Sequence, residues 1–241
     1  MSAAAIFGRE RERQELDARL RARRSFVLHA PSGMGKTALL RSLLPGLSGA
    51  LYCPEALSRE SVFTSLWRQL EAQAGRRHRP LSALGTRGRV RDALAGGEHL
   101  IILDHLRAPS TVFGAGMRDL ARATGAAVIA VARSAHMEEL GSLYSLYPDR
   151  AERYALPPLT PAEAEGLVDW HMAAAPLPAK NLSQFRAQAL EAAAGNPGLL
   201  LGILGLARQD RYWRGGQILF TPLWIDLRLR STLPQNAAAH A

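Results

Sequence analysis

The sequence predicts an α/β fold in which a five-stranded parallel sheet lies between helices, followed by a small helical lid and a short β-type tail. Short apolar runs alternate with helical stretches, as in sheets whose parallel strands are connected by helices. A glycine-rich segment joins the first apolar run to a helix, and Pro157-Pro158 separates the alternating region from a helical one. We therefore expect a core at 1–156, a lid at 157–208 and a tail at 209–241.

The elements of the core follow from apolar runs and from helix start and stop signals. The expected strands are Ser25–His29, Ala50–Cys53, His99–Leu103, Ala127–Ala132 and Glu152–Leu156. The expected helices are Arg9–Arg23, one that begins at the glycine-rich segment and ends before Pro45-Gly46, Ser58–Gln73, Pro109–Ala123 and Ser134–Leu146.

The lid and the tail are read from different signals. Thr160-Pro161-Ala162-Glu163 offers an N-cap threonine, a proline at the first helical position and a glutamate at the third. Lid helices are expected near Pro161–Ala174, Asn181–Ala194 and Pro197–Arg208. In Leu223–Arg230 apolar and polar residues alternate, which predicts a half-buried strand paired with Arg211–Phe220. Pro234–Ala241 is expected to be a disordered end.

Composition narrows the class of protein. The chain has 241 residues, of which 47% are hydrophobic and 21% charged, and its apolar runs are shorter than the roughly 20 residues that a membrane span needs. The single cysteine, Cys53, favours a reducing, cytoplasmic location. The net charge of +9 favours an acidic partner such as nucleic acid. Because nearly all basic residues are arginine, a coding bias towards arginine is the alternative explanation.

The glycine-rich segment has the form of a phosphate-binding loop. Ala30-Pro31-Ser32-Gly33-Met34-Gly35-Lys36-Thr37 follows an apolar strand and opens a helix that continues with Ala38. Its backbone amides can curl around a phosphate because two glycines allow the path, and the helix adds its positive N-terminal end. Lys36 can bridge the β- and γ-phosphates, and the Thr37 hydroxyl can bind Mg²⁺. The segment predicts binding of ATP with Mg²⁺.

A second motif supports the first. Leu100-Ile101-Ile102-Leu103-Asp104 is an apolar strand that ends in a carboxylate, the form of a Walker B motif. Asp104 would hold the magnesium ion at the carboxyl end of the strand. The alternative is a carboxylate that only caps a turn.

With these residues in place, the chain resembles the AAA+/STAND class of P-loop ATPases, a branch that includes origin-recognition ATPases, transposition ATPases and signalling switches. Phe7-Gly8-Arg9-Glu10-Arg11-Glu12 is similar to the box that precedes the P-loop and lies against the adenine. Leu159–Ala164 and Gly195-Asn196-Pro197 are similar to the opening and the turn of the lid, where Pro197 would lie near the nucleotide. The resemblance covers about residues 6–205.

The resemblance also implies two catalytic positions. Arg133, at the end of the fourth strand, would act as a sensor of the γ-phosphate, and the alternative is an ordinary surface arginine. This branch has a second carboxylate after the Walker B aspartate, but the residue here is His105. A neutral imidazole could serve as general base or could only pack, so we expect weak turnover by the isolated protein.

Partners are the least determined part of the function. The basic region from Arg76 to Arg91 could grip nucleic-acid phosphates or could be a solvated loop and helix face. We carry two hypotheses forward. In the first, the chain is a DNA-associated switch ATPase, as in transposition. In the second, it is a largely non-hydrolysing, nucleotide-gated interaction module in a larger complex, with a protein partner on residues 209–233.

Overall fold

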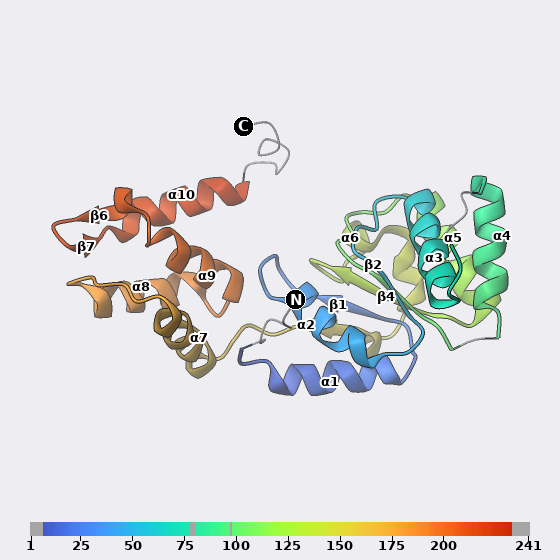
Figure 1. The fold of residues 1–241 in the computed structure, drawn as a ribbon, viewed down its shortest axis with the longest axis horizontal. Helices are drawn as coiled ribbons and strands as arrows, with labels where there is room; N and C mark the ends of the chain where they lie inside the picture. Colours follow the sequence, from blue (N-terminus) through green and yellow to red (C-terminus); the bar gives the residue numbers. More distant parts are fainter. Residues whose placement is uncertain (1–6, 78–80, 97, 233–241) are drawn as a thin grey trace. The chain divides into compact units, whose positions relative to one another are not determined.

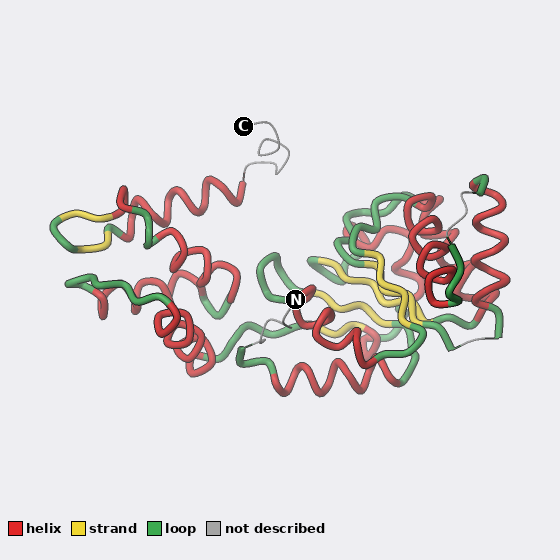
Figure 2. Tube along the Cα trace, viewed as in Figure 1, coloured by secondary structure: helices red, strands yellow, loops and turns green. Residues whose placement is uncertain are grey.

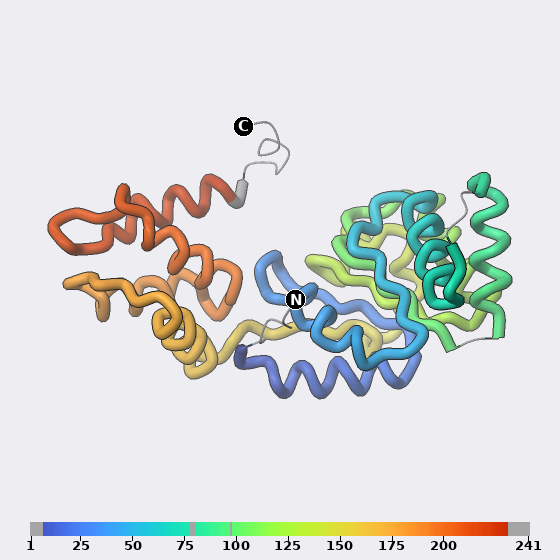
Figure 3. Tube along the Cα trace, viewed as in Figure 1, coloured from blue at the N-terminus to red at the C-terminus, as the bar shows by residue number. Residues whose placement is uncertain are grey.

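A computed structural model describes residues 7–77, 81–96 and 98–232, which form two compact units. The core unit comprises Glu10–Ser32 and Lys36–Pro157, and the lid unit comprises Phe7–Arg9, Gly33–Gly35 and the chain from Pro158 onward. Figure 2 distinguishes their helices and strands, and Figure 3 follows the chain through each of them. No helix in the described ranges is long and apolar enough to cross a membrane.

The predicted fold class is confirmed, because the core unit is built on one five-stranded parallel sheet in the order β2-β3-β4-β1-β5. Its strands are β1 Phe26–His29, β2 Ala50–Cys53, β3 Leu100–Leu103, β4 Ala127–Ala132 and β5 Arg153–Ala155. Every residue of β3 and β4 is buried. These two strands read as uninterrupted apolar runs because helices cover both faces of the sheet.

Helices cover the sheet as the alternating sequence pattern requires. The helices of the core unit are α1 Glu10–Arg21, α2 Lys36–Leu43, α3 Arg59–Gln73, α4 Ala83–Leu94, α5 Thr111–Thr124 and α6 Met137–Leu140. Every second residue of β3, Ile101 and Leu103, joins a cluster with side chains of α3, α4 and α5. Figure 1 shows α1 and α2 on the other side of the sheet from these three helices.

One expected helix of the core is interrupted. Ser134–Leu146 forms only the short helix α6, followed by a 3-10 segment at Gly141–Leu146. Gly141 has a φ of +51°, and a Cβ on it would lie 2.5 Å from the main-chain oxygen of Pro109. The close approach of the Pro109 segment therefore fixes a turn where the sequence pattern predicts a continuous helix.

The lid unit contains the three expected helices, α7 Pro161–Ala174, α8 Leu182–Ala193 and α9 Pro197–Leu206. Thr160 caps α7 with the reciprocal capping box expected from Thr160 and Glu163. A short hairpin, β6 Trp213–Arg214 and β7 Gln217–Ile218, turns at Gly215-Gly216, and α10 Phe220–Thr232 follows it. The helices pack around buried side chains such as Phe185, Ile203 and Leu223.

The prediction of a strand at Leu223–Arg230 is wrong, because this segment lies within α10. Leu223 and Leu227 are one helical turn apart and pack with Trp224 against the lid core, whereas Ile225 and Leu229 are exposed. The same leucines fit a period of two and a period of 3.6, and burial selects the helix. The expected pairing takes place within Arg211–Phe220 instead. The disorder expected for Pro234–Ala241 lies outside the described residues.

Asn181 ties the hairpin to α8. Its amide nitrogen Nδ2 donates to the main-chain oxygen of Ile218 at 3.0 Å, and its Oδ1 accepts from the Ile218 amide at 2.9 Å. One side chain thus replaces both hydrogen bonds of a missing neighbouring strand.

We expect Asn181→Asp to lower the free energy of unfolding by about 1–3 kcal/mol, because a carboxylate cannot donate to the Ile218 oxygen. Gln184→Glu is the matched control, since it makes the same change of charge on the exposed face of α8. Urea denaturation of both variants measures the difference. Equal stability of the two variants would show that the two-way bond contributes nothing.

Candidate nucleotide site

Lys36 and Thr37 open α2 directly after the first strand, as the motif predicts. The Lys36 ammonium, Nζ, donates to the main-chain oxygens of Ala30 at 2.6 Å and Pro31 at 3.1 Å. Burial lowers the pKa of Lys36, and the nearby Asp104 carboxylate opposes that shift. The ammonium is therefore held at the base of the loop by two main-chain oxygens, whose places phosphate oxygens could take.

Asp104 is the most deeply buried carboxylate at the ends of the strands, with 2% of the residue exposed. Its Oδ2 accepts from the Thr37 hydroxyl at 2.8 Å, and its Oδ1 accepts from the His105 amide at 2.8 Å. The two residues that the sequence assigns to magnesium thus meet, although 67 positions separate them in the chain. The shared hydrogen bond places two hard oxygen ligands side by side.

Tyr52 is a member of this cluster that the sequence analysis missed. Its hydroxyl donates to Oδ2 of Asp104 at 2.6 Å, and the guanidinium of Arg41 lies 5.6 Å from the centre of its ring. Burial and the bond to Asp104 raise the pKa of Tyr52 to about 12, so it remains a donor at neutral pH. The only signal in the sequence is a polar residue near the end of the apolar strand β2, which pairs with β3.

His105 stands beside Asp104 in a left-handed conformation, with a φ of +56°. Its Nδ1 lies 3.0 Å from the main-chain oxygen of Pro54 and 3.4 Å from Oδ1 of Asp104. Because a carbonyl oxygen only accepts, this contact places a hydrogen on Nδ1 and leaves Nε2 as the basic nitrogen. The His105 side chain is 54% exposed, so Nε2 can reach solvent.

Arg133 directly follows β4, and its guanidinium is paired with the carboxylate of Glu139. Its Nε lies 3.0 Å from Oε1 of Glu139, and its Nη2 lies 3.4 Å from Oε2. Glu139 is only 16% exposed and acts on the pKa of Lys36 in the direction opposite to Arg133. The sequence analysis missed Glu139, because nothing in a helical stretch marks which carboxylate turns towards the loop.

In the lid unit, the loop glycines pack against the turn that begins α9. The Gly198 amide donates to the Gly33 main-chain oxygen at 2.9 Å, and the Asn196 side chain caps α9 by accepting from the Leu199 amide at 3.1 Å. A Cβ on Gly33 would lie 2.6 Å from Oδ1 of Asn196. Pro197 occupies the first turn of α9 between these contacts.

Gly33 and Gly35 differ in their surroundings. Both have a positive φ, +85° and +89°, which glycine adopts without strain. A Cβ on Gly35 would meet nothing within 4 Å, so this side of the backbone is open. Ser32 lies in the same turn, Met34 is buried, and Ala38 lies on the exposed side of α2.

The predicted adenine box also lies in the lid unit. Arg9 is buried, and its Nη2 donates to the main-chain oxygen of Met34 at 3.4 Å. A Cβ on Gly166 would lie 2.7 Å from the Phe7 ring, and one on Gly8 would lie 2.9 Å from Cβ of Glu163. Phe7–Arg9 therefore runs along α7 and reaches the loop through Arg9.

These donors fit the predicted ligands. Thr37 and Asp104 offer oxygen atoms of the kind that Mg²⁺ prefers, and one ammonium stands at the start of a helix. Within the described ranges no group of three or more His, Cys, Asp or Glu side chains could hold a metal by itself. Magnesium therefore fits here as an ion that also binds phosphate and water.

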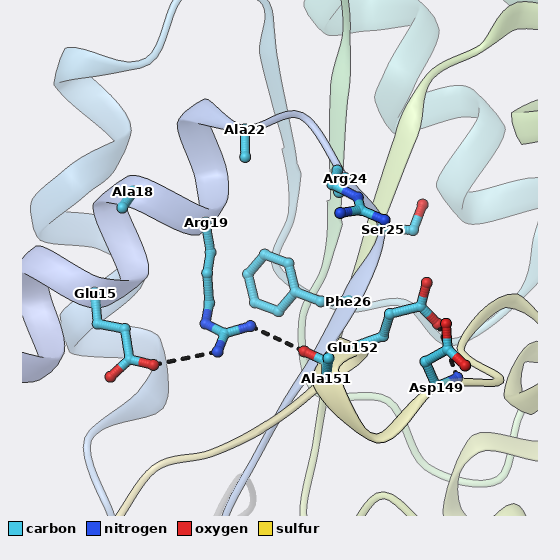
Figure 4. A pocket seen from close by; sticks show the side chains of 10 residues that line it. All are labelled: Glu15, Ala18, Arg19, Ala22, Arg24, Ser25, Phe26, Asp149, Ala151 and Glu152. Atoms are coloured by element: carbon cyan, nitrogen blue, oxygen red, sulfur yellow. Dashed lines mark hydrogen bonds and ion pairs between the residues drawn. The ribbon is translucent and has the colours of Figure 1, made fainter.

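A pocket elsewhere in the core unit has different chemistry. It has a volume of about 440 Å³ and lies beside the start of β1, lined by residues such as Phe26 and Asp149. Figure 4 shows Arg19 extended between Glu15 and the main-chain oxygen of Ala151, to which it is bonded at 3.2 and 3.0 Å. The central cation is already used to join α1 to the segment before β5, and the lining includes no residue of the phosphate loop.

The predicted basic region is only partly a loop. Arg87, Arg89 and Arg91 lie on α4, a helix that the sequence analysis does not predict. His78, Arg79 and Pro80 lie outside the described residues.

The fold has clear counterparts among solved structures, although no family model and no curated protein sequence matches the chain. The ORC1 protein of Aeropyrum pernix in complex with DNA matches with a TM-score of 0.67 and 17% identity, over 96% of this chain and 70% of that one. CDC6P of Pyrobaculum aerophilum matches with a TM-score of 0.58 and 18% identity, over 85% and 64%.

A third structure extends the comparison to signalling ATPases. The STAND protein with a tetratricopeptide-repeat sensor from Pyrococcus horikoshii matches with a TM-score of 0.53 and 14% identity, over 94% of this chain and 33% of that one. The chain thus spans about one third of that protein. At these identities the comparisons concern the fold. The resemblance inferred from the motifs is confirmed at that level: the chain has the fold of the AAA+ P-loop ATPases, and its structural neighbours include origin-recognition proteins.

Proposed function

We propose that this chain binds Mg-ATP at Ala30–Thr37 and works as a slowly hydrolysing AAA+/STAND-type switch on a DNA-associated partner. The observation that carries the proposal is the hydrogen bond of 2.8 Å between the Thr37 hydroxyl and the Asp104 carboxylate, beside the ammonium of Lys36. Hydroxyl, carboxylate and ammonium at the carboxyl ends of parallel strands are the groups that bind a nucleotide triphosphate and its metal.

Each residue has a distinct task in this proposal. Lys36 exchanges its carbonyl partners for phosphate oxygens, and the open side of Gly35 admits the phosphate close to the backbone. Thr37 and Asp104 hold magnesium, which when bound neutralises charge on the phosphates. Tyr52 and the His105 amide fix the Asp104 carboxylate, and Phe7, Gly8 and Arg9 take the base.

Slow hydrolysis follows from the groups that could activate water. His105 can use only Nε2, because its Nδ1 faces the Pro54 oxygen. Glu139 is the nearby carboxylate, but Arg133 holds both of its oxygens. Arg133 would have to leave Glu139 to reach a γ-phosphate, and the same movement would free the Glu139 carboxylate as a base. A partner that promotes this exchange would accelerate turnover.

DNA is the proposed partner for two reasons. The chain carries a net charge of +9, and structural neighbours of the same fold are named as bound to DNA. A transposition or mobile-element role is one form of this proposal. Assembly with further copies or with another protein would complete it.

The alternative function is a nucleotide-gated interaction module that hydrolyses little ATP. The observation that favours it is the exposed apolar pair on α10, Ile225 at 51% and Leu229 at 56% exposure. Exposed apolar residues one turn apart are suited to a protein partner.

We expect Lys36→Ala to weaken Mg-ATP binding by about 10- to 100-fold, the value of one lost charge-assisted bond. Isothermal titration calorimetry measures the Kd of Mg-ATP for the wild-type chain and for the variant. The matched control is Lys180→Ala, which removes the only other lysine of the chain from an exposed position. Unchanged affinity in Lys36→Ala would contradict the site.

We expect Tyr52→Phe to raise the Mg²⁺ concentration needed for half-maximal ATP binding by about tenfold, as for other groups that orient a metal ligand. The reason is that the substitution removes the hydroxyl that donates to Oδ2 of Asp104 at 2.6 Å but keeps the aromatic ring of residue 52. Tyr144→Phe, on the 3-10 segment after α6, is the control. A fluorescent ATP analogue titrated with MgCl₂ gives the midpoints, and coincident midpoints would refute the role of Tyr52.

We expect the purified chain to hydrolyse ATP well below the median enzyme rate of about 10 s⁻¹. Double-stranded DNA should raise the rate, and Lys36→Ala should abolish it with and without DNA. Steady-state phosphate release measures all four conditions. Slow turnover that DNA leaves unchanged favours the interaction module, and rapid turnover by the monomer contradicts both hypotheses.

A further inference from the structure

A groove in the core unit has no part in the nucleotide site. It has a volume of about 720 Å³ and is lined by α3, α4 and one side of α5 from Val112 to Ala123. On α4 the lining residues are Leu84, Arg87, Gly88 and Arg91, spaced as one face of a helix. On α5 they include Val112 and Gly116, again with helical spacing. The groove is thus bounded by two helix faces with small residues along them.

The walls of the groove combine exposed apolar and cationic side chains. Leu84 is 75% exposed and Val112 is 56% exposed, although both are on the wall of a concavity. Exposure of large apolar residues next to a groove is typical of surfaces that bind another molecule. These two side chains would bury apolar area only when the groove is filled.

The charges of the groove are mainly positive. Arg59, Arg87 and Arg91 line it, and Asp119 is the one acidic lining residue. Oδ1 of Asp119 lies 4.0 Å from Nη1 of Arg122. Nη2 of Arg59 lies 3.0 Å from Oε1 of Glu60, which is not a lining residue. Arg87 donates to the main-chain oxygen of Ala83 at 3.2 Å, and Arg91 has no ion-pair partner within the described ranges. An occupant therefore meets exposed apolar side chains together with arginines, one of which, Arg59, lies across Gly116.

We infer that this groove binds an acidic amphipathic helix of a partner protein. A helix places leucine-like side chains at i, i+3, i+4 and i+7 against Leu84 and Val112 and carboxylates towards the arginines. A Cβ on Gly88 would meet nothing within 4 Å, so the backbone of that helix can approach α4 closely there, whereas the Arg59 side chain covers Gly116. Nucleic acid fits less well, because the one aromatic residue of the lining, Phe63, is buried and offers no exposed ring for a base.

The probe is a fluorescein-labelled peptide of about 18 residues, five helical turns, with leucines at the four positions of one face and glutamates beside them. Fluorescence anisotropy with the full chain should give saturable binding with a Kd of about 1–100 μM. A peptide with lysines in place of the glutamates should bind at least about tenfold more weakly. Absence of saturable binding by the acidic peptide would overturn the inference.

Gly88→Trp blocks the groove without disturbing the fold. A Cβ on Gly88 would meet nothing within 4 Å, so a side chain can be added there without a clash at its base, and tryptophan is a better helix former than glycine by a few tenths of a kcal/mol. We expect binding to fall by at least about tenfold while the thermal midpoint is maintained. Unchanged binding would place the peptide elsewhere.

Charge reversal tests whether the acidic peptide binds in this groove or is attracted by the positive charge of the protein as a whole. Arg91→Glu should weaken the acidic peptide by at least about tenfold, whereas Arg89→Glu, which is exposed on the same helix but outside the groove, should leave it unchanged. Equal losses in the two variants would overturn the inference. A second outcome would also overturn the inference: a DNA duplex of about 20 base pairs binds the wild-type chain but does not bind Gly88→Trp. The groove would then be a nucleic-acid site.

Discussion

The Asp104 carboxylate is the point on which the core unit depends. It is a carboxyl group with 2% exposure, and donors from three segments satisfy it: Thr37 from α2, Tyr52 from β2 and the amide of His105. A buried carboxylate that loses such partners costs several kcal/mol. The site and the fold therefore stabilise each other, since the strands that form the sheet also bring together the donors that satisfy this carboxyl group.

Much of the fold could be predicted because the governing signals are local. β3 and β4 are covered on both faces, so each reads as an unbroken apolar run, and Thr160 with Glu163 marks the start of α7 within four residues. The prediction of a strand at Leu223–Arg230 failed for a physical reason. Leu223 and Leu227 satisfy both periods, and only packing against the lid core decides between them. The sequence pattern of Ser134–Leu146 likewise carries no information about the distant Pro109 segment that interrupts the helix.

The same distinction between local signals and tertiary structure applies to the candidate nucleotide site. The proximity of Lys36, Thr37 and Asp104 could be predicted because phosphate-binding chemistry requires fixed spacing within one loop and one strand end, and their assignment to a nucleotide stays a prediction. Tyr52 and Glu139 could not, because each reaches the site only through the register of β2 with β3 or through the turn after β4. Residues that orient a ligand come from any element that the fold brings to the site, so their positions follow from tertiary structure rather than from a motif.

Two hydrogen bonds join the backbone of Gly33 and Met34 to other parts of the lid unit. The Gly33 carbonyl is bonded to the Gly198 amide, and the Arg9 guanidinium is bonded to the Met34 carbonyl. Amides that turn towards a phosphate must rotate the peptide units to which these carbonyls belong, since each peptide group is planar. Under the proposed function, a phosphate bound by these amides would therefore act, through these two hydrogen bonds, on the first turn of α9 and on Phe7–Arg9.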